Sequence, residues 1–161
     1  MKIIISTLFC ITLLLGATGS LLAQTALDQQ IKSDINITRQ MVNDKRNTAL
    51  AFNMNFTHEE KEAFWPLYRE YRGAIAEVND KRVKVIVRYA DNVNNMTEKL
   101  AQELLDESMD LDEEILQVKQ HYIRKFRHIL PNTKVARLMQ IENRMDAMVF
   151  IKISEAIPLV Q

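Results

Sequence analysis

Residues 56–73 read FTHEEKEAFWPLYREYRG, and this stretch carries the clearest helix signal in the chain. Thr57 and Glu60 have the spacing of a capping box, in which the threonine hydroxyl accepts from the third helical amide and the glutamate reaches back. The apolar residues that follow are spaced by three and four, as on one face of a helix. That face continues through Phe64, Leu67, Tyr71, Ala74, Val78, Val85 and Tyr89. The stretch therefore predicts a long helix that begins at Thr57 and buries one side.

The chain's only tryptophan, Trp65, directly precedes Pro66 inside this helix. A proline in a helix interior removes one backbone hydrogen bond and clashes with the carbonyl four residues earlier, here that of Glu62. Two arrangements accommodate it: a kink in the helix, or a short separate turn over residues 57–65. The aromatic residues around it cover three sides of the helix, so some pack on neighbouring helices or form an exposed binding patch. These residues are Phe64, Trp65, Tyr68 and Tyr71.

Three more helical segments flank this one, and no strand-like alternation competes with them. The first covers about residues 27–52, with Ile31, Ile35, Thr38, Val42, Lys45, Ala49 and Phe52 on its inward face. The third begins near Thr97 and presents Leu104, Ser108, Leu111, Ile115, Val118, Tyr122, Lys125 and Ile129. The fourth covers about residues 132–156, between two prolines, with Val135, Leu138, Met145, Val149 and Ala156 inward.

Charge placement predicts how the second and third helices meet. Each is acidic in its early turns and basic in its late turns, an order that suits the helix macrodipole. The late turns of the second helix hold Lys81, Arg82, Lys84 and Arg88, and the third is acidic from Glu98 to Glu114. A fold back through residues 91–95 (DNVNN) sets these opposite charges beside each other. We therefore predict an all-α fold of four helices with an antiparallel central helical hairpin.

The N-terminus has the pattern of a secretory signal peptide. Lys2 is followed by an almost wholly apolar run over residues 3–15, then small residues and Ala23 before the predicted cleavage point. An uncleaved membrane anchor is the alternative, because no charge lies between Ile3 and Ala23. We predict a signal peptide at 1–23, a single helical domain at 24–161, and a periplasmic location. The only cysteine, Cys10, falls in the signal segment, so the mature chain has neither disulfides nor thiol chemistry.

The sequence predicts neither an enzyme nor a cofactor. It contains no glycine-rich phosphate loop, no G-x-S-x-G pattern and no E-x-x-H pair of the kind that di-iron bundles use. Loss of residues 1–23 removes Lys2 from 21 basic and 21 acidic residues, which leaves 20 and 21. Such a balanced charge predicts no nucleic-acid partner, and membrane contact only through an uncleaved signal segment.

We predict no specific metal site, although two features could hold a cation. The acidic run over residues 103–114 lacks the loop and glycine of an EF-hand, and is better explained as a solvated face opposite the basic end of the second helix. His121 and His128 lie two helical turns apart, about 10 Å, which is too far for one zinc ion. His58 stands near acidic residues but without a recognised ligand spacing. A weak cation site stays the alternative.

Methionines and aromatic residues provide the candidate partner-binding surface. Methionine fills irregular cores but also lines adaptable binding surfaces, and three methionines cluster on the fourth helix. Core filling and client binding are both consistent with this cluster. The candidate surface consists of Trp65, Tyr68, Met139, Met145 and Met148.

The signal peptide, the four helices and two helix-opening elements together resemble the Spy/CpxP-type periplasmic proteins with LTxxQ motifs. The first element is FTHEE at 56–60, and the second, more degenerate one is LPNTK at 130–134. The positions that match the motif are Phe56, Thr57, Glu60 and Leu130. The stretches FWPLYREY (64–71) and LPNTKVARLMQIENRMDA (130–147) look like an uncharacterised branch of exported helical proteins grouped with that family.

This resemblance, which covers about residues 37–160, implies an ATP-independent periplasmic protein. Members of the family are cradle-shaped antiparallel dimers that bind unfolded clients, so the resemblance also allows a homodimer here. We expect non-enzymatic, chaperone-like binding of unfolded or envelope proteins in a stress response. The alternative is a signalling adaptor or sensor domain, metal-responsive or not, that binds one specific envelope partner.

Overall fold

The computed structural model describes residues 29, 33, 37 and 40–156, which are almost entirely helical. An N-terminal helix, continuous over residues 40–53, precedes α2 (His58–Asn92). The short 3-10 turn η1 (Val93–Asn95) leads into α3 (Glu98–Phe126), and α4 (Asn132–Ala156) follows. Because these residues include no strand, the predicted all-α class is confirmed for the described part of the chain. The predicted signal peptide at 1–23 lies outside it.

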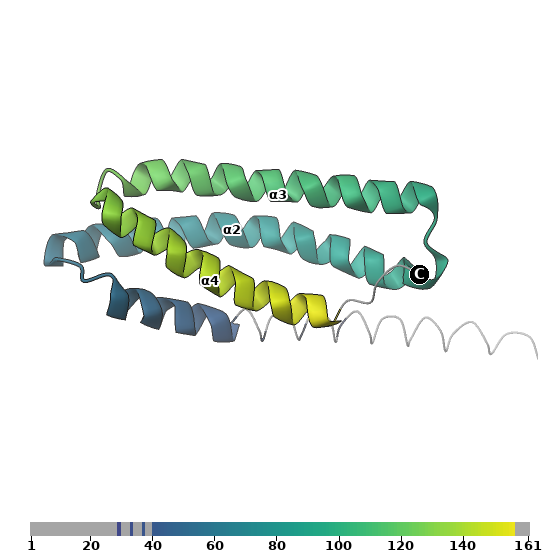
Figure 1. Ribbon diagram of the computed structural model, residues 1–161, viewed down its shortest axis with the longest axis horizontal. Helices are drawn as coiled ribbons and strands as arrows, with labels where there is room; N and C mark the ends of the chain where they lie inside the picture. Colours follow the sequence, from purple (N-terminus) through teal and green to yellow (C-terminus); the bar gives the residue numbers. More distant parts are fainter. Residues whose placement is uncertain (1–28, 30–32, 34–36, 38–39, 157–161) are drawn as a thin grey trace, which may run out of the picture.

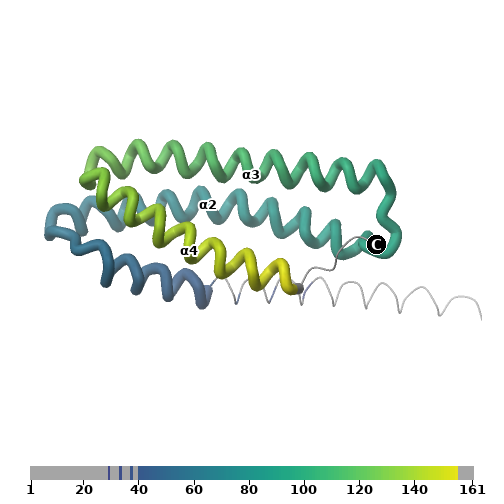
Figure 2. Tube along the Cα trace, viewed as in Figure 1, coloured from purple at the N-terminus to yellow at the C-terminus, as the bar shows by residue number. Residues whose placement is uncertain are grey.

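The helices lie roughly side by side in an elongated molecule (Figure 1). The N-terminal helix meets α2, and α3 meets α4, at the same end, whereas η1 lies at the opposite end (Figure 2). None of the helices in the described ranges has the length and apolar character needed to span a membrane.

The start of α2 has the capping box that the sequence predicts. The Thr57 hydroxyl accepts from the Glu60 amide at 3.2 Å, and Glu60 Oε2 accepts from the Thr57 amide at 2.8 Å. Farther along, α2 runs without interruption through Pro66, so a separate short turn over residues 57–65 is wrong. The carbonyl that loses its amide partner is that of Glu62. Both Glu62 and Pro66 are exposed, so water can donate a hydrogen bond to this carbonyl.

The charged ends of α2 and α3 pair across the space between these helices. Lys81 Nζ lies 2.6 Å from Glu114, Arg82 Nη2 lies 2.6 Å from Asp112, and Arg88 Nη1 lies 2.6 Å from Glu107. Near the opposite end, Lys125 Nζ is 3.6 Å from Glu70. These exposed pairs favour the antiparallel orientation of α2 and α3, although each stabilises the fold by only about 0–1 kcal/mol.

The main core lies at the end of the molecule where both pairs of helices join. Phe64 is fully buried, and its ring centre lies 4.5 Å from that of Phe56 and 5.7 Å from that of Phe126. All four helices or their adjoining turns contribute to this core, through Leu50, Met54, Phe64, Tyr68, Tyr71, Ile75, Phe126, Leu130, Val135, Leu138 and Ile141. The chain reverses beside it at Asn55, whose positive φ of 46° is a conformation that asparagine adopts more readily than most residues.

The inward face predicted for the N-terminal helix is wrong in its later turns. Lys45 is exposed and Phe52 is 83% exposed, while Val42, Arg46 and Leu50 form the buried face. The predicted stripe followed a four-three spacing that places Lys45 inward, whereas the structure buries the next residue, Arg46, because carboxylates of α4 pair with it. The earlier residues of that stripe, Ile31, Ile35 and Thr38, lie outside the described residues.

Candidate functional site

Charged side chains from every described helix meet around the buried Arg46 and Glu142, in what we call the buried polar cluster. It consists of Arg46, Tyr68, Arg72, Lys119, Glu142 and Asp146. Glu142 is fully buried, and its carboxylate accepts from the Tyr68 hydroxyl at 2.7 Å and from Arg72 Nη1 at 3.0 Å. A buried carboxylate is costly without such donors, so these bonds hold α4 in one register against α2.

Arg46 extends the cluster to the N-terminal helix. Its side chain is only 2% exposed; Nη2 donates to Asp146 Oδ1 at 2.8 Å, and Nε lies 3.6 Å from Glu142 Oε1. The second oxygen of Asp146 accepts from Lys119 Nζ of α3 at 3.1 Å. One carboxylate of α4 therefore joins the N-terminal helix to α3, and the cluster as a whole connects all the helices.

Burial and nearby charge change the protonation of two tyrosines at this cluster. Burial raises the pKa of Tyr68 above its usual value, and the Glu142 carboxylate, which accepts a hydrogen bond from the Tyr68 hydroxyl, raises it further. Burial also raises the pKa of Tyr71, with a further contribution from Glu142. The Tyr71 hydroxyl has no hydrogen-bond partner among the described residues. Both phenols thus stay neutral in the folded state.

We expect the protein to lose stability at high pH because of these two phenols. In the unfolded chain a tyrosine ionises near pH 10, whereas Tyr68 and Tyr71 retain their protons in the fold. The free energy of unfolding should be unaffected by them below about pH 10 and should fall as pH rises above it. Absorbance near 295 nm, recorded alongside circular dichroism, should show that these phenols ionise only as the helices unfold.

The variant Tyr71→Phe is the matched control for this titration, because it removes one phenol whose hydroxyl has no partner among the described residues. This variant should weaken the pH dependence of the free energy of unfolding above about pH 10, and it should remove one phenol that ionises only on unfolding. Ionisation of all four tyrosines near pH 10 in a chain that stays helical would contradict the buried arrangement.

Sequence reasoning missed the buried polar cluster, although one signal for it was present. The predicted inward residues Leu138 and Met145 on α4 leave a gap at the position where the four-three spacing expects an apolar residue, and Glu142 occupies it. A carboxylate within an apolar stripe indicates a buried ion pair. No such signal marks Arg46, because its partner Asp146 is 100 residues away in the sequence.

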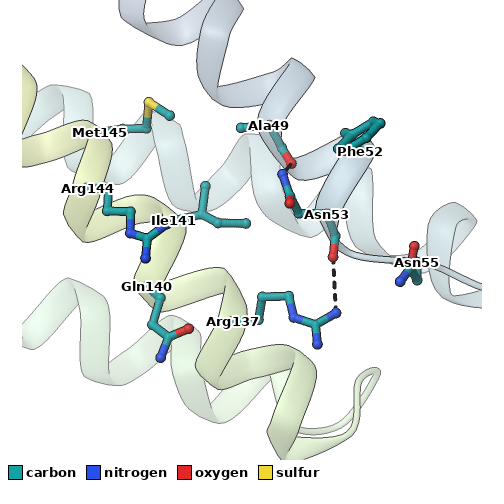
Figure 3. Close-up of a pocket in the computed structure, with 9 residues that line it drawn as sticks. All are labelled: Ala49, Phe52, Asn53, Asn55, Arg137, Gln140, Ile141, Arg144 and Met145. Carbon is teal, nitrogen blue, oxygen red and sulfur yellow. Dashed lines mark hydrogen bonds between the residues drawn. The ribbon is translucent and has the colours of Figure 1, made fainter.

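A groove runs between the N-terminal helix and α4, and we call it the α4 groove (Figure 3). Its volume is about 700 Å³, and its walls are Ala49, Phe52, Asn53, Asn55, Arg137, Gln140, Ile141, Arg144 and Met145. Arg137 Nη1 donates to the Asn53 carbonyl at 3.1 Å across the groove. Arg144, by contrast, makes no hydrogen bond or ion pair with any residue in the described ranges. The groove therefore combines apolar side chains with two guanidinium groups.

Large apolar side chains also stand in solvent on three of the helices. On α3, Leu105, Met109 and Leu116 are each more than half exposed, and their spacing of four and seven places them in one line about 16 Å long. The others are Ile37, Met41 and Phe52 on the N-terminal helix, and Met148, Phe150 and Ile151 on α4. We call the α3 line the outer α3 stripe. It faces away from Leu104 and Leu111, two of the buried residues of the same helix.

The residues predicted as a partner-binding surface differ in burial and do not all lie at the surface. Tyr68 is 2% exposed and bonded to Glu142, so it contributes to the interior and not to a surface. Trp65 is half-buried, with its ring 5.2 Å from that of Phe64 and 5.8 Å from that of Tyr68. Met139 and Met145 pack against the core, Met145 also lines the α4 groove, and Met148 is exposed.

The two predicted motif elements lie together at the core end of the molecule. Phe56 packs against the core, Thr57 caps α2, and Leu130 is buried before α4. The fifth positions of the two elements form an ion pair between Glu60 and the Lys134 ammonium. That hydrogen bond holds the pKa of Glu60 below its usual value. These residues therefore start and join two helices.

The histidines and acidic residues do not form a metal site in the described part of the chain. Within it, no three or more His, Cys, Asp or Glu side chains are grouped so that they could hold a metal ion. His58 Nε2 lies 3.3 Å from Glu62 one helical turn later, and the ring of His121 contacts that of Tyr122.

Comparison with known proteins adds no relative: no family model matches the chain, and no significant match is found among curated proteins or solved structures. The described residues form an almost entirely helical structure that contains the buried polar cluster, the outer α3 stripe and the α4 groove.

Proposed function

We propose that the protein is a non-enzymatic periplasmic binding protein that acts like a chaperone. It would hold unfolded or partly folded envelope proteins during stress, without nucleotide. The observation that carries this proposal is the set of large apolar side chains held in solvent, with Phe52 83% exposed and Phe150 69% exposed. Apolar surface that a fold leaves exposed in lines and grooves is typical of sites that bind other polypeptides.

The architecture supports holding a client without closing around it. The aromatic core and the buried polar cluster join the helices to one another, and the residues of the outer α3 stripe belong to neither. An unfolded chain presents scattered apolar residues, which a line such as the outer α3 stripe can contact in many registers. The predicted export signal and the resemblance to Spy/CpxP-type proteins favour the periplasm as the place where this happens.

A second candidate function is an adaptor that binds one envelope partner. The α4 groove favours it, because a groove with two arginines on one wall presents a more selective surface than an apolar stripe. Capture from an envelope extract distinguishes the two functions. A holding protein should recover many polypeptides, whereas an adaptor should recover one dominant partner.

The test is light scattering of several unrelated proteins as they unfold and aggregate, at equimolar ratio and without nucleotide. The variant that changes Leu105, Met109 and Leu116 to glutamine should protect less than the natural protein, since it removes exposed apolar area only. Glu113→Gln, an exposed change on the same helix, is the matched control and should protect fully. Equal protection by both variants would show that clients bind elsewhere than on the outer α3 stripe. If the natural protein protects no client, the proposed function is wrong.

A further inference from the structure

We infer that the α4 groove binds an acidic amphipathic helix from a partner protein. This inference rests on the proposed function, because it states which kind of polypeptide segment one surface of the binding protein selects. The ligand helix would carry two carboxylates about seven residues apart, with apolar residues between them. Four features of the groove support this choice: its charge, the spacing of that charge, its apolar walls and its small number of cations.

The charge of the groove is positive and only partly satisfied. Arg137 and Arg144 are the charged residues among those lining it, and no acidic side chain is included. Arg137 uses one nitrogen for the Asn53 carbonyl, and Arg144 has no partner in the part of the chain that the structure describes. A guanidinium has five N–H donors in a fork that suits carboxylates. Both side chains therefore have donors left for an acidic ligand.

The spacing of the two arginines suits a helical ligand. They are seven residues apart on α4, which corresponds to about 10 Å along the helix axis, with Gln140 on the same face between them. Two carboxylates seven residues apart on a second helix have the same separation. A ligand helix that lies along α4 can thus meet both arginines at once, with neither chain distorted.

The apolar side chains of the groove lie where such a ligand would bury its own. Ile141 and Met145 lie beside the arginines on α4, while Ala49 and Phe52 come from the opposite wall (Figure 3). Phe52 is 83% exposed and lies outside the core, so its ring can move onto a ligand without disturbing the packing of the core. A helix in a groove is held by apolar residues at three-four spacing, and these would fall between the two carboxylates.

A helical partner fits this groove better than a nucleic acid does. Non-specific nucleic-acid binders neutralise on the order of 6–10 phosphates, whereas this groove offers two cations on a mixed wall. A second copy of the chain also carries an acidic helix with exposed apolar residues, α3. Self-association through α3 is therefore an outcome that the experiment must separate.

The experiment measures the affinity of the purified protein for two labelled helical peptides by fluorescence anisotropy. One peptide of about 18 residues, long enough to form a helix, carries two glutamates seven apart with leucines between them, and the other carries lysines in their place. We expect the glutamate peptide to bind at least about fivefold more tightly, and Arg144→Gln to weaken it about fivefold. Arg124→Gln, an exposed change on α3, should leave the affinity unchanged.

Equal binding of the two peptides, no binding of either, or an affinity that Arg144→Gln leaves unchanged would overturn the inference. So would a dimer of the protein alone that Arg144→Gln dissociates, since the occupant would then be a second copy. The aggregation test separates this from the proposed function. If unfolded proteins are protected but the peptides fail, only the groove assignment is lost. If the glutamate peptide binds selectively but no client is protected, the assignment of the α4 groove is retained and the chaperone-like function is wrong.

Discussion

Replacing Glu142 with alanine is expected to lower the free energy of unfolding by about 3–5 kcal/mol. The fully buried Glu142 carboxylate accepts from the Tyr68 hydroxyl and from Arg72, and lies close to Arg46. Its removal leaves Arg46 buried with one carboxylate where it had two, and leaves the Tyr68 hydroxyl without an acceptor. Urea unfolding followed by circular dichroism measures the change.

Glu155→Ala is the matched control for this substitution, because Glu155 is an exposed glutamate on the same helix. It should change the free energy of unfolding by less than about 0.5 kcal/mol. Glu142→Gln separates charge from shape, since the amide oxygen can still accept from Tyr68 but carries no charge. A loss below about 1 kcal/mol for Glu142→Ala would show that the buried polar cluster does not hold the helices together.

Replacing Phe64 with alanine should also lower the free energy of unfolding by about 3–5 kcal/mol. Phe64 is completely buried, and its ring lies within 6 Å of four other aromatic rings, those of Phe56, Trp65, Tyr68 and Phe126. The cavity left behind would lie where α2, α3 and the turn before α2 meet. Thermal and urea unfolding both report the loss.

Phe52→Ala is the matched control for Phe64→Ala. Both are phenylalanines near the same end of the molecule, but Phe52 is 83% exposed. Its truncation should change stability by less than about 0.5 kcal/mol. Comparable losses from the two substitutions would indicate that Phe52 packs inward, as the sequence pattern alone predicts.

Local features of the fold could be predicted from the sequence because neighbouring residues determine them. Thr57 and Thr97 cap the helices that they precede, and α4 covers the predicted residues from Asn132 to Ala156. Caps and helix ends depend on side chains only three or four residues away. Ion pairs between α2 and α3 could be anticipated for a similar reason, since a short turn joins the two helices.

Features that depend on distant residues could not be predicted in this way. The face of the N-terminal helix was misassigned because Arg46 is buried only through its contacts with α4. The sequence leaves open whether Tyr68 packs inward or contributes to a binding surface, because its acceptor, Glu142, lies 74 residues along the chain. The α4 groove joins residues of the N-terminal helix to residues near position 140, so it exists only in the folded molecule.

In the function that we propose, exposed apolar surface on a stable helical frame holds unfolded polypeptides. Its most direct test is light scattering of several unrelated unfolding proteins with an equimolar amount of this protein, without nucleotide. We expect the aggregation of each client to be suppressed. Clients that aggregate as fast with the protein as without it would contradict the claim.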